Sequence, residues 1–287
     1  MKICTSKQAL RTQIKHWQSQ HKTIAFVPTM GNLHAGHIAL VEHAKTLADK
    51  IVVSIFVNPT QFDKAEDLQA YPRTMQADQQ KLEAVQTDLL FLPSVEVMYP
   101  SLTDVCTVQV PASANILEGA SRKGHFAGVA TVVAKLFNLV QPNIAVFGQK
   151  DFQQLMIVRQ MVADLDFDID IIGLPTVREA DGLAMSSRNA YLSEDERVKA
   201  SGLFREIDKI RQLIEWGRSD YLNLQNEAMR NLEKQGFVPD YIEVRRQQDL
   251  QIPNSDDGEL VILAAVWLGK ARLIDNIAFE INHFDYS

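Results

Sequence analysis

The sequence predicts an α/β fold in which a doubly wound parallel sheet is followed by a smaller α+β domain. Up to about residue 175, short apolar runs alternate with amphipathic segments, the pattern of strands joined by helices in a parallel sheet. Beyond Tyr191 the pattern changes to two helical segments and then three strand-like runs. A chain of 287 residues is long enough for roughly two domains. We therefore expect one domain over residues 1–177 and a second over residues 178–287.

In the first domain, strands are expected at the apolar runs and helices where apolar residues recur at helical spacing. The expected strands are residues 23–27, 51–57, 88–92, 143–147 and 168–175. The expected helices are residues 38–49, 68–85, 130–140 and 152–165. Strands and helices in this order favour a sheet with helices on both faces, as in Rossmann-like folds.

In the second domain, Ser193 and Glu196 have the spacing of a capping box, which predicts a helix running toward Trp216. A second helix is expected near residues 221–235. The strand-like runs follow at residues 241–245, 259–268 and 271–280, and a two-residue Gly-Lys turn signal separates the last two. This part therefore reads as a small α+β domain with an antiparallel hairpin.

Composition limits the classes of protein to which the chain can belong. The 46% hydrophobic and 23% charged content is ordinary for a globular protein, and the net charge of −7 argues against a large nucleic-acid surface. The longest apolar run, residues 260–268, is about half of the ~20 residues that a membrane helix requires. The N-terminus lacks the apolar region of a signal peptide, and Cys4 and Cys106 form no framework. We expect a cytoplasmic protein with no membrane or nucleic-acid partner.

Residues 28–37 (PTMGNLHAGH) follow an apolar run and lead into a helical pattern. A strand that ends in a glycine-containing turn and feeds a helix presents free N–H groups and a positive dipole end to an anion. Gly31 and Gly36 let the backbone approach closely. His34 and His37 lie three residues apart, so in a first helical turn both imidazoles project to one side and can donate to the same phosphate. The motif predicts a nucleotide-phosphate site.

Two other interpretations fit this spacing when it is taken alone. Paired histidines can bind zinc, but the chain has no His-Glu-x-x-His signature, and its two cysteines lie far apart outside any ligand motif. A capping turn with surface histidines is the other interpretation. It stays open until a second motif is considered.

Two further segments carry groups suited to a polyphosphate. Ser186, Ser187 and Arg188 follow the last expected strand of the first domain and offer two hydroxyls and a guanidinium that can bind two oxygens at once. Gly148 and Lys150 stand where the expected strand at 143–147 passes into a helix, the position at which open parallel sheets bind ligands. Taken alone, the Ser-Ser-Arg segment is equally compatible with an anion-binding site and with a polar turn between domains. The Gly148 and Lys150 segment favours the anion-binding interpretation.

These motifs resemble the two signatures of the nucleotidyltransferase and class I aminoacyl-tRNA synthetase superfamily. The segments between them are NPTQF at 58–62, YPR at 71–73, LEG at 117–119, GHF at 124–126 and KDFQQ at 150–154. Together they resemble the pantothenate synthetase family, ligases that join pantoate to β-alanine at the expense of ATP. The resemblance runs from about Pro28 to Tyr191.

The resemblance implies a reaction in two steps. The pantoate carboxylate attacks the α-phosphorus of ATP and releases pyrophosphate, and the β-alanine amine then displaces AMP from the acyl adenylate. Negative charge that builds on the phosphates is stabilised electrostatically, with help from Mg²⁺ whose ligands the sequence does not identify. The residues that stabilise this charge are His34, His37, Lys150, Ser186, Ser187 and Arg188. His37 is also described in the family as a proton donor, but the sequence does not distinguish hydrogen bonding from proton transfer.

The family also implies which positions bind each substrate. The implied ATP site comprises Met30, Gly31, Asn32, Leu33, His34, Ala35, Gly36, His37, Gly148, Gln149, Lys150, Asp151, Val177, Met185, Ser186, Ser187 and Arg188. The implied pantoate and β-alanine site comprises Gln61 and Gln154, with Asn58, Tyr71 and Arg122 as further candidates. Side-chain amides suit this site because they both donate to and accept from hydroxyl and carboxylate groups.

The chain departs from the family pattern at two positions. Gln149 stands where glutamate is common, and Lys123 stands where proline is common before the GHF segment. Gln149 removes a negative charge but keeps a polar side chain of similar size, and Lys123 can loosen a turn or add a cation near the substrate. Neither changes the His, Lys or Ser-Ser-Arg residues.

The resemblance further implies a homodimer and a C-terminal domain that closes over ATP as a lid, with residues 178–189 as the hinge and lid contact. Two rival functions remain at this stage. A related nucleotidylyltransferase would leave AMP joined to a phosphorylated acceptor. A non-catalytic nucleotide-binding module, including an RNA-binding relative, would use the fold for binding alone.

Overall fold

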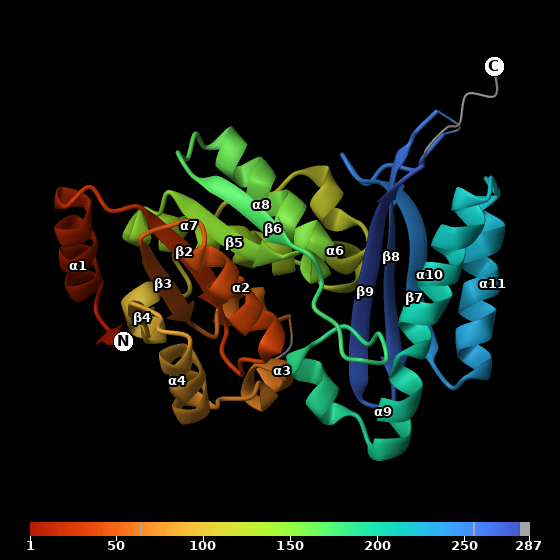
Figure 1. The fold of residues 1–287 in the computed structure, drawn as a ribbon, viewed down its shortest axis with the longest axis horizontal. Helices are drawn as coiled ribbons and strands as arrows, with labels where there is room; N and C mark the ends of the chain where they lie inside the picture. The colour runs from red at the N-terminus through yellow and green to blue at the C-terminus, as the bar shows by residue number, and fades with distance from the viewer. Residues whose placement is uncertain (64, 255, 282–287) are drawn as a thin grey trace. The chain divides into compact units, whose positions relative to one another are not determined.

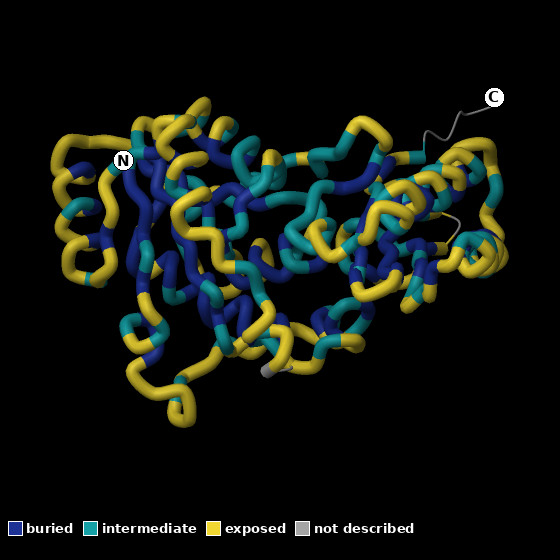
Figure 2. The backbone as a smooth tube through the Cα atoms, turned by 90° about the horizontal axis from the view of Figure 1, so that it is seen from below, coloured by how far each residue is buried: buried dark blue, intermediate teal, exposed yellow. Residues whose placement is uncertain are grey.

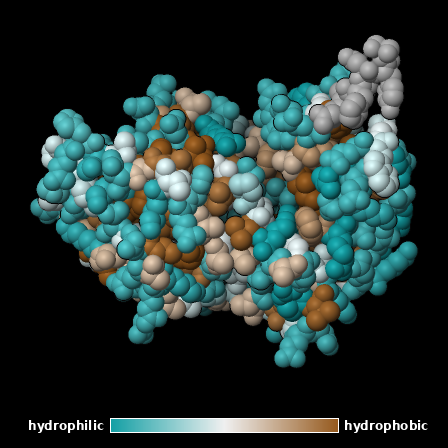
Figure 3. Space-filling view, viewed as in Figure 1, coloured by the Kyte–Doolittle hydropathy of each residue, from teal (hydrophilic) through white to brown (hydrophobic). Residues whose placement is uncertain are grey.

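The computed structural model describes residues 1–63, 65–254 and 256–281, and the chain divides into two compact units, Met1–Thr176 and Val177–Ser287 (Figure 1). The central strands β2 and β3 of the first unit and β8 of the second are mostly buried, whereas most helices and the loops carry exposed positions (Figure 2). Hydrophilic side chains predominate on the outer surface of both units on the face drawn in Figure 3. None of the helices among the described residues is long and apolar enough to cross a membrane.

The first unit is built on a six-stranded sheet in the order β1-β4-β3-β2-β5-β6, and all its strand pairs are parallel. The strands are β1 (Lys2–Cys4), β2 (Ile24–Thr29), β3 (Lys50–Ile55), β4 (Leu89–Phe91), β5 (Ile144–Gly148) and β6 (Asp170–Leu174). From β2 the chain builds outward through β3 and β4 on one side and continues through β5 and β6 on the other. The carboxyl ends of β2 and β5 therefore form the topological switch point, where doubly wound sheets bind ligands.

Helices cover both faces of this sheet. They are α1 (Lys7–Ser19), α2 (Ala35–Lys45), α3 (Ala65–Ala70), α4 (Met75–Ala84), α5 (Val95–Met98), α6 (Glu118–Ser121), α7 (His125–Val140) and α8 (Phe152–Asp164), with short 3₁₀ segments η1 (Pro59–Gln61), η2 (Ala112–Asn115) and η3 (Gln149–Asp151). Successive strand residues alternate between two cores because a strand repeats every two residues. On β2, Ala25 and Val27 pack with α2 and α4, whereas Ile24 and Phe26 pack with α1, α7 and α8.

The second unit is a three-stranded antiparallel sheet in the order β7-β8-β9, with helices packed against one face (Figure 1). Its elements are η4 (Ser187–Tyr191), α9 (Glu194–Ala200), α10 (Gly202–Glu215), α11 (Tyr221–Lys234), β7 (Val238–Arg246), β8 (Glu259–Leu268) and β9 (Ala271–Glu280). The expected capping box is present, since the Ser193 hydroxyl accepts from the Glu196 N–H and the Glu196 carboxylate from the Ser193 N–H. The expected hairpin joins β8 to β9 with Leu268 opposite Ala271.

The fold class expected from the sequence is confirmed, but two expected helices are interrupted. The helix expected at 68–85 is divided into α3 and α4, because Pro72 lacks an N–H and disfavours helical backbone in the residue before it. The helix expected from Ser193 toward Trp216 is divided at Ser201, which ends α9 and begins α10. The sequence analysis also missed β1 and α1, which are short or weakly apolar segments at the N-terminus.

Candidate active site

The loop after β2 is held by two side chains of α4 that the sequence analysis did not identify. The buried Asp78 carboxylate accepts hydrogen bonds from the N–H groups of Asn32 at 2.9 Å and Leu33 at 2.8 Å. One helical turn later, Lys81 donates to the Leu33 carbonyl at 2.5 Å. Gly31 has φ +83°, and a Cβ there would lie 3.0 Å from the Ile55 side chain and 3.2 Å from the Asp78 carboxylate. The loop conformation therefore depends on a glycine and a buried carboxylate.

His34 and His37 form a reciprocal cap at the start of α2. The Nδ1 atom of His34 accepts from the Gly36 N–H at 3.2 Å, and Nδ1 of His37 accepts from the His34 N–H at 3.3 Å. A nitrogen that accepts a hydrogen bond carries no proton, so both neutral rings are the tautomer with the proton on Nε2. The ring centroids lie 4.1 Å apart. Each ring thus uses one nitrogen to cap the helix and retains the other as an N–H donor.

The surroundings of this pair favour neutral imidazoles. Burial lowers the pKa of His34 to about 3, and the neighbouring His37 ring and the Lys150 cation act in the same direction. Burial also lowers the pKa of His37 to about 4, although the Asp151 carboxylate opposes the shift. Both rings are therefore neutral N–H donors near pH 7.

The segment after β5 lies beside these histidines. Gly148 ends the strand, η3 contains Lys150 and Asp151, and α8 follows directly. Because β2 and β5 are neighbouring parallel strands, their carboxyl ends lie at the same edge of the sheet, and the charges of Lys150 and Asp151 act on both imidazoles. The backbone of the first unit therefore brings two of the three phosphate-type motifs together. Gln149, on the same segment, donates to the Gly173 carbonyl at 3.3 Å.

Gln61 ends η1 and is almost fully buried. Its Oε1 accepts from the Asn58 Nδ2 at 3.0 Å, so its amide NH₂ group points away and approaches the Met30 sulfur at 3.2 Å. Asn58 also donates to the Gly128 carbonyl and accepts from the backbone N–H and hydroxyl of Thr60. Both ends of the Asn58 amide are thus occupied by contacts within the protein, and one of these contacts fixes the orientation of the Gln61 amide. Gln61 presents a donor suited to a carboxylate or hydroxyl.

The remaining substrate-site candidates lie on neighbouring elements of the first unit. Tyr71 follows α3, and its ring meets that of Phe62 edge-on with centroids 5.7 Å apart. Arg122 is the C-cap of α6, and Gln154 lies in the first turn of α8. Next to it, the buried Gln153 accepts from the Glu118 N–H and donates to two backbone carbonyls of residues 113–116. Gln153 thereby fixes the segment before Arg122, a role that the sequence analysis did not identify.

The third motif belongs to the second unit and follows a small hairpin. Within residues 177–185, Met185 N–H donates to the Val177 carbonyl, and Arg178 and Ala184 form an antiparallel bridge. The hairpin leads to Ser186, whose hydroxyl accepts from the Arg188 N–H at 3.2 Å as the N-cap of η4. The geometry of this segment is thus determined by the hairpin before it.

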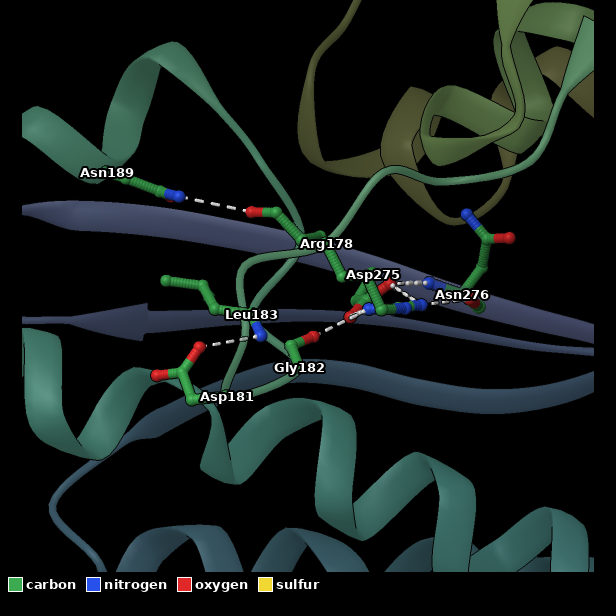
Figure 4. A network of polar contacts seen from close by, with 8 residues as sticks. Arg178, Asp181, Gly182, Leu183, Asn189, Asp275 and Asn276 are labelled. Carbon is green, nitrogen blue, oxygen red and sulfur yellow. Dashed lines mark hydrogen bonds and ion pairs between the residues drawn. The ribbon is translucent and has the colours of Figure 1, made fainter. Parts of the chain in front are cut away.

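The hairpin is anchored by Arg178, as Figure 4 shows. Its guanidinium makes two hydrogen bonds to the Asp275 carboxylate on β9, at 2.6 and 3.0 Å. It also donates to the carbonyls of Gly182 and Asn276 and lies over the Phe204 ring, 3.9 Å from the centroid. No local pattern in the sequence indicates this network, because Arg178 and Asp275 are 97 residues apart along the chain.

Comparison with known proteins assigns the chain to a family. The family described as pantoate-beta-alanine ligase matches residues 2–278. The chain belongs to this family. A pantothenate synthetase from Methylococcus capsulatus is 53% identical over 283 residues, which cover 98% of this chain and 99% of that protein. One from Nitrosococcus oceani is 48% identical over 286 residues, which cover 99% of this chain and 100% of that protein.

Solved structures agree with this family membership. The crystal structure of pantothenate synthetase from Thermus thermophilus matches with a TM-score of 0.89 and 43% identity, covering 96% of this chain and 99% of that one. A pantoate-beta-alanine ligase from Francisella tularensis, complexed with beta-gamma ATP and beta-alanine, matches with a TM-score of 0.81 and 37% identity. That match covers 97% of each chain.

Proposed function

We propose that the chain condenses pantoate with β-alanine to pantothenate at the expense of ATP. The observation that carries this assignment is membership of the pantoate-β-alanine ligase family over residues 2–278. The Francisella relative was solved with beta-gamma ATP and beta-alanine, which correspond to two of the three substrates that the reaction requires. (R)-pantoate is the third, and its carboxylate attacks the α-phosphorus of ATP to form pantoyl adenylate and pyrophosphate. The β-alanine amine then attacks the acyl carbon and AMP leaves.

In the first step the residues at the switch point bind and orient the triphosphate. The start of α2 contributes the positive end of the helix dipole, and His34 and His37 contribute two Nε2–H donors, because their Nδ1 atoms accept from the backbone. Lys150 supplies a positive charge beside them. Donors fixed before the substrate arrives stabilise the charge that develops on the phosphates without reorganisation. An anion held by the two imidazoles raises their pKa, and this is the route by which His37 would become a proton donor.

The acid substrate is oriented by amides and a guanidinium. The NH₂ group of Gln61 and the side chain of Gln154 hydrogen-bond the pantoate hydroxyls and carboxylate, and Arg122 and Tyr71 complete this part of the site. Asn58 acts by fixing the orientation of the Gln61 amide. These contacts hold the pantoate carboxylate and the α-phosphorus of ATP in a productive geometry. In a ligase that forms no covalent enzyme intermediate, such positioning supplies a large part of the reduction in the activation barrier.

Ser186, Ser187 and Arg188 serve as a second set of phosphate donors, with Met185 and Val177 beside the nucleotide. Their support is the sequence motif and the rigid hairpin that presents them within the second unit. We propose that this unit acts as a lid that closes over ATP, and that the protein works as a homodimer in the cytoplasm, as the family resemblance implies. Closure would exclude water from the acyl adenylate.

Mg²⁺ is proposed as the metal that accompanies ATP. It is commonly held by one or two carboxylates together with substrate phosphates rather than by a complete protein cage. Among the described residues no group of three or more His, Cys, Asp or Glu side chains could hold a metal alone, which fits that mode. Asp151, whose charge reaches both active-site histidines, is the carboxylate we assign to it. Bound Mg²⁺ would neutralise charge on the phosphates.

The test compares the complete reaction mixture with mixtures that each lack one substrate. Purified protein is incubated with ATP, Mg²⁺, pantoate and β-alanine, each acid or amine is left out in turn, and the nucleotide and acyl products are identified. AMP and pantothenate that appear only in the complete mixture support the ligase. AMP that stays joined to another acceptor would point to a nucleotidylyltransferase, and ATP binding without turnover would point to a binding module. Either result overturns the proposal.

A further inference from the structure

His125 connects two of the residues proposed to bind the acid substrate, although nothing in the sequence analysis assigned it a role. It lies in the first turn of α7, and its side chain is buried. Its Nε2 lies 3.1 Å from Nη1 of Arg122, and its Nδ1 lies 2.8 Å from the backbone carbonyl oxygen of Gln61. One imidazole ring therefore bridges the end of α6 and the end of η1.

The chemistry of the two partners determines the state of the ring. A guanidinium only donates hydrogen bonds, so Nε2 of His125 is an acceptor and carries no proton. A carbonyl oxygen only accepts, so Nδ1 carries the proton and donates to Gln61. The two contacts agree on one neutral tautomer, opposite to that of His34 and His37. A protonated ring would lose the acceptor for Arg122 and place a second cation against it.

The electrostatic surroundings keep this ring neutral. Burial lowers the pKa of His125 to about 4, and the Arg122 cation acts in the same direction. The hydrogen bond to Gln61 and the carboxylates of Glu118 and Asp151 oppose the shift. The Phe126 ring packs beside it, with centroids 5.0 Å apart.

The contact between α7 and η1 leaves little freedom for Gln61. A Cβ on Gly128, one turn after His125, would lie 2.4 Å from the Thr60 carbonyl oxygen and 2.8 Å from the Gln61 Cα. The Gly128 carbonyl also accepts from Asn58, which in turn fixes the Gln61 amide. The backbone of Gln61 is therefore held by His125 and its side chain by Asn58.

We propose that His125 is a positioning residue for the acid substrate, which sets the Arg122 guanidinium and the Gln61 amide in a fixed relation to each other. The inference rests on the proposed function, because the two residues that it positions are those assigned to pantoate. His125 itself acts through them and needs no contact with the substrate. Its loss should therefore weaken pantoate recognition and leave ATP recognition nearly intact.

The kinetic test uses His125→Asn, alone and combined with Arg122→Ala. Asn keeps a short donor for the Gln61 carbonyl but lacks an acceptor that reaches Arg122. We expect the KM for pantoate to rise about tenfold or more, the loss typical of a hydrogen bond to a charged group, with the KM for ATP changed little. In the Arg122→Ala background the further rise should be much smaller, since the shared contact is already gone. His16→Asn, on the exposed part of α1, is the matched control and should leave every constant unchanged.

Fully additive effects of the two substitutions, equal increases in both KM values, or an unchanged pantoate KM would each overturn the proposal. A second measurement needs neither turnover nor a variant. Long-range ¹H–¹⁵N spectra of the wild-type imidazoles at pH 7 should show His125 protonated on Nδ1 and both His34 and His37 protonated on Nε2. An Nε2–H tautomer or a charged ring at His125 would contradict the inference. Wild-type protein that makes no pantothenate but shows the Nδ1–H ring would instead contradict the proposed function.

Discussion

Arg178 and Asp275 form a bidentate ion pair in which the Asp275 side chain is only 3% exposed and the Arg178 side chain 20% exposed. The pair joins the hairpin before Ser186 to the edge strand β9. Two charges that are removed from water gain little net stability from each other. Because both Asp275 oxygens are hydrogen-bonded and Arg178 also stacks on Phe204, we infer that the pair mainly fixes the position of the hairpin.

Removing one partner should destabilise the second unit. Asp275→Ala leaves the Arg178 cation without its carboxylate in a largely buried place, which typically costs about 3–5 kcal/mol. Chemical denaturation followed by far-UV circular dichroism measures the change. The matched control is Asp181→Ala, which breaks the more exposed ion pair between Asp181 and Arg197 and should cost about 1 kcal/mol or less. Equal losses in the two variants would show that burial does not determine the contribution of the Arg178 pair.

Asp78 should control the affinity for ATP without contacting the acid substrate. Asp78→Ala removes the acceptor for the N–H groups of Asn32 and Leu33 and leaves both donors unsatisfied, a cost of about 1–3 kcal/mol for each buried group that water does not reach. We expect the loop to relax and the Kd for ATP to rise at least tenfold, while the Kd for pantoate changes little. Isothermal titration calorimetry with each substrate separates the two effects. Unchanged ATP binding by a folded variant would contradict the role of Asp78 in holding this loop.

The depressed pKa values of His34 and His37 predict the direction of a pH effect on stability. In the unfolded chain these imidazoles take up protons as the pH falls through about 6.5, whereas in the folded chain they do so only near pH 3 and 4. Between these limits the unfolded state binds more protons, so the free energy of unfolding should be highest above pH 6.5 and fall as the pH is lowered toward 4. Urea denaturation at several pH values measures the slope.

The variant His37→Gln should flatten that slope, because one of the groups that titrate differently in the two states is gone. The same pKa values predict that kcat/KM for ATP shows no inflection near pH 6.5 from these residues, since kcat/KM reports the free enzyme. An inflection there that disappears in His37→Gln would mean that the ring is protonated in the free protein at neutral pH.

Gly128→Ala tests the close approach of α7 to η1. Alanine favours a helix by about 1 kcal/mol over glycine, so on propensity alone the substitution should stabilise α7. Its Cβ would instead lie 2.4 Å from a backbone oxygen of Thr60, which cannot rotate away as a flexible side chain would. We expect η1 to shift, the melting temperature to fall, and the KM for pantoate to rise more than the KM for ATP. A stabilised variant with normal kinetics would show that η1 yields without affecting Gln61.

Local patterns predicted the strands β2 to β6, the capping box at Ser193 and the β8–β9 hairpin because each is marked by residues close together in sequence. The strand-to-helix corners after β2 and β5 were predicted for the same reason. The residues that orient those corners were not. Asp78 acts on a loop 45 residues earlier, and Arg178 pairs with a carboxylate 97 residues later. A single sequence carries no signal for such contacts, since a lone Asp or Arg in a polar segment is equally typical of a solvated surface.

His34 and His37 have a consequence for how the start of α2 can vary. Within each ring the two nitrogens have different roles, because Nδ1 caps the helix and Nε2 carries the proton and can donate. Asparagine can cap a helix but is too short to present a donor at the same distance, and lysine extends further but cannot accept from the backbone. Imidazole combines both properties in a rigid plane. Any replacement of His34 or His37 therefore changes both the cap of α2 and the N–H donor, so the activity of such a variant reports on both changes at once.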